Sequence, residues 1–233
     1  MTKTLVLCMI LFMVFDSKLT ILVGLNGSGK TTIAVNAALF LGRRQNEVLR
    51  KQVLLADLDI VNPYFRSKDA EKALLEAKVT FISSEYAGSG LEAPSLPKMV
   101  DGIFAAPGHI ILDIGGDEAG ATVLGRYADK IQAVADRQCL LVFNPYRLLT
   151  QTVADTKELL HGIERVSRIP FTGFLYNPNL GAATTAEDVR CKLPLANELA
   201  EETKLPLAAT CVKRQLAPLL LDIEDLFCMD LIY

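Results

Sequence analysis

The 233-residue chain has few of the residues from which metal sites and disulfide frameworks are built. It contains two histidines, and its five cysteines are an odd number that includes no C-x-x-C pair. This pattern lacks the ligand spacing of a zinc site, so we predict none. The widely spaced cysteines favour buried thiols in a reducing compartment, and we therefore expect a cytoplasmic protein.

The chain also lacks an excess of charge and a long apolar run. A formal net charge of −3 gives no sign of a dedicated nucleic-acid binder. The apolar run Thr4–Phe15 is 12 residues long, whereas a membrane-spanning helix needs about 20. We predict an apolar N-terminal extension over residues 1–18 and a single nucleotide-binding domain over residues 19–233. We do not expect a membrane partner, although a weak surface association stays open.

What the chain does have is a complete phosphate-loop motif. Residues 24–31 read G-L-N-G-S-G-K-T, which fits G-x-x-x-x-G-K-[ST], and they follow the apolar run Leu19–Val23. In such a loop, backbone N–H groups and the next helix's N-terminus hold a polyphosphate, while the lysine reaches its β- and γ-phosphates. The predicted nucleotide-binding residues are Gly24, Asn26, Gly27, Ser28, Gly29, Lys30, Thr31 and Thr32. The Thr31 hydroxyl is a predicted Mg²⁺ ligand.

The rest of the chain alternates apolar strand signals with helical segments. Strands are predicted at Val53–Ala56, Val79–Ile82, His109–Leu112, Leu140–Phe143 and Phe171–Tyr176, in addition to Leu19–Val23. Helices are predicted at Thr32–Leu41, stopping at Gly42, at Ser67–Lys78 and at Gln215–Tyr233, and residues 83–97 read as a surface loop. Continuous apolar strands separated by helices predict an α/β fold of the P-loop NTPase type, with a mostly parallel twisted sheet flanked by helices on both faces.

Acidic residues follow two of these strands. Asp113 comes after an apolar strand and precedes Ile114-Gly115-Gly116, which predicts a carboxylate that holds Mg²⁺ through water. Asp57 and Asp59 are two residues apart, so both can point the same way from an extended segment. We predict that Asp57 helps to hold the metal and that Asp59, with Lys30, is catalytic, although Asp57 remains a rival for that role. A helix cap at Asp113 and an acidic turn at Asp57 and Asp59 are the alternatives.

Taken together, these motifs resemble one group of P-loop ATPases. The phosphate loop, the segment L-A-D-L-D-I-V-N-P (residues 55–63) and the segment I-L-D-I-G-G (residues 111–116) look like the MinD/ParA and cobyrinic acid a,c-diamide synthase (CobQ/CbiA) group. The similarity spans roughly residues 19–215. It implies ATP and Mg²⁺ as ligands, Asp57 and Asp59 as switch I acids and Asp113 as the Walker B acid. It also implies Asn177 as the residue that reads adenine.

Two features bear on the nucleotide and on assembly. Asn144 is the rival of Asn177 as the base-reading residue, and neither continues as N-K-x-D, so the sequence disfavours GTP. The MinD/ParA proteins carry a signature lysine that reaches across an ATP-bound dimer, and this chain has Leu25 at that place. A homodimer driven by that lysine is therefore in doubt. Arg126 is an alternative cation for the role of this missing lysine, but we interpret it as a surface residue.

The sequence leaves several functions in competition. We favour a nucleotide-dependent switch with slow ATPase activity, read by a protein partner or a second copy. The main alternative is an ATP-dependent synthetase of the dethiobiotin synthetase or cobyrinate amidation type, which phosphorylates a small-molecule carboxylate. An ABC- or SMC-type ATPase is a weaker alternative, because Ile114 rather than glutamate follows Asp113. A small-molecule kinase stays open at a similar level, because the phosphate loop alone does not separate hydrolysis from transfer to a hydroxyl.

Overall fold

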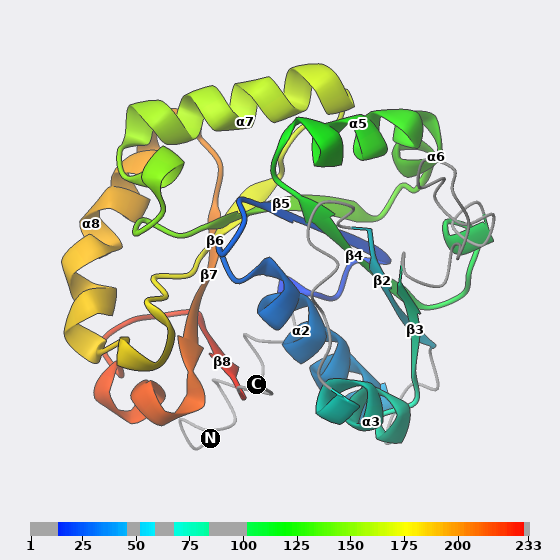
Figure 1. Ribbon diagram of the computed structural model, residues 1–233, viewed down its shortest axis with the longest axis horizontal. Helices are drawn as coiled ribbons and strands as arrows, with labels where there is room; N and C mark the ends of the chain where they lie inside the picture. The colour runs from blue at the N-terminus through cyan, green and yellow to red at the C-terminus, as the bar shows by residue number, and fades with distance from the viewer. Residues whose placement is uncertain (1–13, 46–51, 59–67, 84–101, 231–233) are drawn as a thin grey trace.

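A computed structural model of the chain describes residues 14–45, 52–58, 68–83 and 102–230 (Figure 1). Eight strands within these ranges form one sheet in the order β3-β2-β4-β1-β5-β6-β7-β8. Every pairing in it is parallel. The strands are β1 (Leu19–Gly24), β2 (Val53–Asp57), β3 (Val79–Ser83), β4 (His109–Gly115), β5 (Arg137–Phe143), β6 (Gly173–Tyr176), β7 (Leu207–Lys213) and β8 (Leu226–Met229).

Helices cover both faces of the sheet (Figure 1). One face carries α2 (Lys30–Gln45) and α3 (Lys68–Glu76), and the other carries α5 (Glu118–Arg126), α6 (Ala128–Ala133), α7 (Val153–Ser167) and α8 (Ala186–Thr203). Successive side chains of β1 enter two different apolar clusters, with Ile21 and Val23 in one and Leu22 in the other. Because both faces are buried, the strands can be continuously apolar, which is the pattern that the sequence shows. The predicted α/β fold is confirmed.

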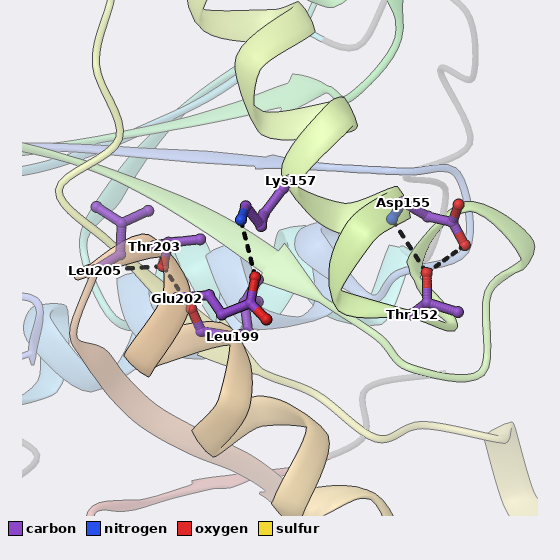
Figure 2. A network of polar contacts seen from close by, with 7 residues as sticks. All are labelled: Thr152, Asp155, Lys157, Leu199, Glu202, Thr203 and Leu205. Carbon is purple, nitrogen blue, oxygen red and sulfur yellow. Dashed lines mark hydrogen bonds and ion pairs between the residues drawn. The ribbon is translucent and has the colours of Figure 1, made fainter.

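Local sequence chemistry sets the ends of α7 and α8, as Figure 2 shows. The Thr152 hydroxyl accepts from the Asp155 backbone N–H at 3.1 Å and caps the start of α7. At the end of α8, Thr203 donates to the Leu199 carbonyl at 2.6 Å and accepts from the next segment's backbone. An ion pair of 2.8 Å between Lys157 and Glu202 joins the two helices. These contacts fix α7 and α8 over the β5–β7 part of the sheet.

The predicted stop of the first helix at Gly42 is wrong, because α2 continues to Gln45. Gly42 serves a close approach instead. A β-carbon on it would lie 2.7 Å from the Ala77 carbonyl oxygen and 2.9 Å from a Val79 methyl. The glycine therefore lets α2 pack tightly against the segment that enters β3.

The predicted helix over Gln215–Tyr233 is also wrong. The described part of this stretch forms a 3-10 helix, η4 (Arg214–Leu219), and then the strand β8, which pairs with β7. Pro218 lies inside η4 and Asp225 has φ 54°, so the backbone cannot hold a continuous α-helix through them. Some apolar side chains of this stretch pack against the sheet and its neighbours, as Leu226 does at 2% exposure, whereas Leu219 and Leu221 are exposed.

The beginning of the described chain joins this C-terminal region. Phe15 is 1% exposed and packs edge-on against Phe227 of β8, with 5.0 Å between ring centroids. Two cysteines, Cys139 and Cys211, are buried as expected, but Cys191 is exposed on α8. None of the helices in the described ranges is both long and apolar enough to cross a membrane.

Candidate functional site

The phosphate-loop motif lies between β1 and α2, at the edge of the sheet where the parallel strands end. The Ser28 N–H donates to the Leu25 carbonyl at 2.9 Å, which folds the loop back on itself before α2 begins at Lys30. Asn26 and Gly27 are exposed and form the outer rim. Lys30 is 5% exposed, and Ser28 is buried with a hydroxyl that has no hydrogen-bond partner among the described residues. The loop thus has the concave backbone that a polyphosphate requires.

Three glycines of the loop are required by its geometry. Gly27 and Gly29 have φ of 71° and 90°, which favours glycine at both positions. A β-carbon on Gly29 would lie 2.3 Å from the Asn177 amide nitrogen, and one on Gly24 would lie 2.5 Å from Ser28 Oγ. Larger residues at these positions would therefore clash with Asn177 and Ser28 and displace the loop.

The acids predicted from the sequence meet this loop from β2 and β4. Asp57 and Asp113 are direct neighbours in the β2–β4 register and are 4% and 1% exposed. The Thr31 hydroxyl donates to Asp113 Oδ2 at 2.5 Å. Because register partners in a parallel sheet point to the same face, both carboxylates face the start of α2. Asp59, the favoured catalytic acid, lies outside the described residues.

These oxygen atoms suit magnesium better than a transition metal. Mg²⁺ prefers carboxylate, hydroxyl and phosphate oxygens and keeps several waters, so one or two protein carboxylates are enough. The described part of the chain contains no group of three or more His, Cys, Asp or Glu side chains that would hold a metal by themselves. Asp57, Asp113 and Thr31 therefore fit a magnesium ion that arrives with a polyphosphate.

Asn177, at the end of β6, supports the phosphate loop directly. Its side-chain amide donates to the Ser28 carbonyl at 2.6 Å, and the residue is 1% exposed. The Asn179 side-chain nitrogen also faces this part of the loop, 3.7 Å from the position that a β-carbon on Gly29 would take. The structure thus places Asn177 in contact with the loop, while its role in reading adenine stays a prediction.

The rival residue, Asn144, shapes the turn after β5. Its side-chain nitrogen donates to the Asn179 carbonyl at 3.0 Å, and its Oδ1 accepts from the Tyr146 N–H at 3.0 Å. Thr150 closes the turn by donating its hydroxyl to the Asn144 carbonyl at 2.6 Å. Both side-chain ends of Asn144 are therefore used to join the β5 and β6 ends of the site.

Two contacts of the loop were not anticipated from the sequence. Arg147 Nε donates to the Gly27 carbonyl at 2.7 Å, and its guanidinium lies over that glycine. Gly116, just after β4, approaches the loop from the other side, since a β-carbon there would be 2.3 Å from the Gly24 carbonyl carbon. The position of these two residues in the sequence could have indicated the contacts, because each residue follows a strand that ends at the same edge of the sheet. Arg126, the cation considered from the sequence, is exposed near the end of α5.

Comparison with known proteins gives a fold and no closer assignment. No protein-family model matches the chain, and no curated protein does. Among solved structures it is similar to the cell division protein FtsY from Thermotoga maritima, with 19% identity over 89% of this chain and 68% of that one, and a TM-score of 0.50. The signal recognition particle receptor FtsY from Elizabethkingia anophelis gives 16% identity, coverages of 96% and 66%, and a TM-score of 0.50.

A third structure is the nucleotide-binding protein in complex with ADP from Archaeoglobus fulgidus, with 14% identity, coverages of 87% and 84%, and a TM-score of 0.45. The chain spans 60% of the length of a further similar structure, the FtsY from Mycoplasma mycoides. At such low identities these likenesses speak only to architecture. The chain has the α/β fold of P-loop NTPases, with one parallel sheet and helices on both of its faces.

Proposed function

We propose that the chain binds ATP with Mg²⁺ at the phosphate loop and hydrolyses it slowly, acting as a nucleotide-dependent switch. The observation that carries the proposal is the 2.5 Å hydrogen bond from Thr31 to Asp113. It joins the hydroxyl of the phosphate-loop motif to a buried strand acid, so that two predicted magnesium ligands already lie together. Lys30, the first residue of α2, adds a cation at the place where the β- and γ-phosphates are expected.

The proposed role of each group in nucleotide binding and hydrolysis follows from its position in the site. Loop N–H groups and the N-terminus of α2 bind the polyphosphate. Thr31, Asp57 and Asp113 would hold Mg²⁺, which supplies positive charge to the phosphate oxygens when bound. Asp59 remains the proposed residue that orients the attacking water, with Asp57 as its rival. Catalysis of this kind rests on positioning and electrostatics, and a few fixed charges are enough for it.

ATP is preferred to GTP because of the residues that follow β6. Asn177-Pro178-Asn179-Leu180 has proline where the guanine-reading motif N-K-x-D has lysine, and leucine where it has aspartate. Without that aspartate the site has no carboxylate to accept the two N–H groups of guanine. The similar FtsY structures share the fold at 16 to 19% identity, which does not transfer a base preference to this chain.

A switch is favoured over the synthetase by the packing of β4 on the loop. Gly116 lies so close to Gly24 and Leu25 that a β-carbon would come within 2.3 to 2.7 Å of their backbone atoms. A change in the loop on phosphate release would therefore move the segment after Asp113, where a partner can detect it.

Calorimetry of ATP, ADP and GTP binding with Mg²⁺ tests this function. Lys30→Ala should abolish ATP binding, because the β- and γ-phosphates lose their cation. Lys72→Ala is the matched control, since Lys72 is an exposed lysine on α3, away from the loop. Retained ATP affinity in Lys30→Ala, or a preference for GTP in the unaltered protein, would contradict the assignment. A slow release of phosphate that depends on Mg²⁺ would support turnover.

A further inference from the structure

Arg147 is an arginine at the rim of the phosphate loop that the proposed chemistry has not yet used. Its Nε donates to the Gly27 carbonyl at 2.7 Å. Three guanidinium atoms, Cζ, Nη2 and Nε, lie 3.0, 3.1 and 3.2 Å from the position that a β-carbon on Gly27 would take. These near-equal distances mean that the flat face of the guanidinium covers Gly27. The φ of 71° favours glycine at this position, and the missing side chain leaves room for the guanidinium.

The turn that carries Arg147 is held firmly. The Arg147 N–H donates to the Asn144 carbonyl at 3.1 Å, and its carbonyl accepts from the Thr150 N–H at 3.0 Å. Thr150 is 2% exposed, and the neighbouring Tyr146 hydroxyl donates to the Asp188 carbonyl of α8 at 2.9 Å. A turn fixed on both sides presents its arginine without a large loss of conformational entropy on binding.

The part of the chain that the structure describes gives the charge of Arg147 no counter-ion. Within the described ranges, Arg147 makes no ion pair, and its one side-chain hydrogen bond uses Nε alone. The four N–H bonds on Nη1 and Nη2 remain available, and these form the planar fork that matches phosphate oxygens. Two other arginines do have a carboxylate partner: Arg190 pairs with Asp222 at 2.7 Å, and Arg214 pairs with Asp230 at 2.7 Å.

We propose that Arg147 is a second cation of the phosphate site, a positioning residue that holds the rim of the loop through Gly27 and brings positive charge to the polyphosphate beside Lys30. The loop itself contains a single lysine and no other basic residue. A polyphosphate that fills the nest lies against the backbone of Gly27, which Arg147 covers. The inference rests on the proposed nucleotide site and adds to it a residue from the turn after β5.

The test compares nucleotides that differ only in the number of phosphates. Binding of AMP, ADP and ATP is measured by calorimetry with Mg²⁺ for the unaltered protein, Arg147→Gln and Arg147→Lys. Glutamine can still donate to the Gly27 carbonyl but has no charge, whereas lysine keeps the charge and loses the fork. Loss of one charge-assisted contact should weaken ATP binding by roughly tenfold or more in Arg147→Gln, less for ADP and least for AMP. The ATP affinity of Arg147→Lys should lie between that of the unaltered protein and that of Arg147→Gln.

A matched control lies at the start of β5, the strand that precedes the turn with Arg147. Arg137 starts β5, is half-buried, and donates its Nη1 to the Gln132 and Val134 carbonyls at 3.0 and 2.8 Å. Arg137→Gln removes a similar backbone clamp far from the loop, so it should leave nucleotide binding unchanged. Thermal unfolding without nucleotide shows whether each variant is folded.

The outcomes separate this inference from the proposed function. The same loss of affinity for AMP, ADP and ATP in Arg147→Gln would mean that Arg147 only clamps the loop, and the proposal would be wrong. Unaltered ATP affinity in that variant would overturn it as well. If the unaltered protein binds no nucleotide, the proposed function itself fails. A loss that grows with each phosphate and shrinks in high salt supports the second cation.

Discussion

The hydroxyl of Thr31 joins the phosphate loop to the strand acid Asp113, and its removal is the sharpest test of the site. In Thr31→Val the side chain keeps nearly the same shape but cannot donate to Asp113 Oδ2, a bond of 2.5 Å in the structure. Thr31→Ser is the matched control, because serine keeps the hydroxyl and also fits the motif. Any difference between the two variants therefore reports the hydroxyl rather than the backbone position.

The magnitude follows from the burial of the acceptor. Asp113 is 1% exposed, so a lost partner is poorly replaced by water on that side. Hydrogen bonds to charged groups contribute about 1.5–3 kcal/mol, and the partial exposure of Thr31 favours the lower end. We expect Thr31→Val to lower the free energy of unfolding by about 1.5 kcal/mol, which corresponds to roughly 3–6 °C in melting temperature for a chain of this size.

Two assays should agree for this variant. Urea unfolding without nucleotide should show the loss of stability in Thr31→Val and little change in Thr31→Ser. ATP titrations with and without Mg²⁺ should show that the gain in affinity from Mg²⁺ falls roughly tenfold in the valine variant, because the ion loses a protein ligand. If valine and serine variants behave alike in both assays, the Thr31–Asp113 bond has no part in the site and the reasoning fails.

Three further predictions concern other parts of the same edge. Asp59→Asn should leave ATP affinity nearly unchanged while phosphate release slows at least tenfold, and unchanged turnover would move the catalytic role elsewhere. Asn177→Ala should cost about 1–3 kcal/mol in urea unfolding, because the buried Ser28 carbonyl loses its 2.6 Å donor; a neutral effect would contradict that support. The Arg214 hydrogen bond lowers the pKa of Asp230, so its stabilising effect is present above the ordinary carboxyl pKa near 4 and is lost on further acidification. The difference in β8 amide exchange between the unaltered protein and Asp230→Asn should therefore shrink steadily as the pH falls below 4, and a difference that does not shrink would refute the link.

Six of the eight strands in the described ranges, β1 to β6, and their order of appearance could be predicted because their signals are local, whereas β7 and β8 were not predicted as strands. Each apolar run from Leu19–Val23 to Phe171–Tyr176 contains or overlaps a strand of the sheet, since burial on both faces leaves no room for polar residues. The phosphate loop could be placed for a similar reason, because its glycines, lysine and threonine follow one another in the chain. Such features need no knowledge of distant partners.

The errors arose where a distant partner decides the conformation. Gly42 looks like a helix end in the sequence. In the structure it has no side chain because the Ala77 carbonyl, 35 positions later in the chain, lies too close to leave room for one. The stretch that ends in β8 has helical composition, but β7 offers it a free strand edge, and pairing there outweighs local propensity. Arg147 was missed in the same way, because its partner Gly27 is 120 residues away.

The sheet order has a consequence for how this site would change with nucleotide. β1 lies between β4 and β5, so the phosphate loop is contacted from two sides. On one side, Asn177 and Arg147 hold it with side-chain hydrogen bonds to Ser28 and Gly27. On the other side, the Thr31 hydroxyl donates to Asp113 of β4, and the segment after Asp113 approaches the loop at Gly116 through close backbone packing. Side-chain hydrogen bonds resist displacement in direction as well as distance, whereas a glycine contact lets the backbone slide. Movement on phosphate release should therefore pass to the segment after β4, and the turn after β5 should stay fixed.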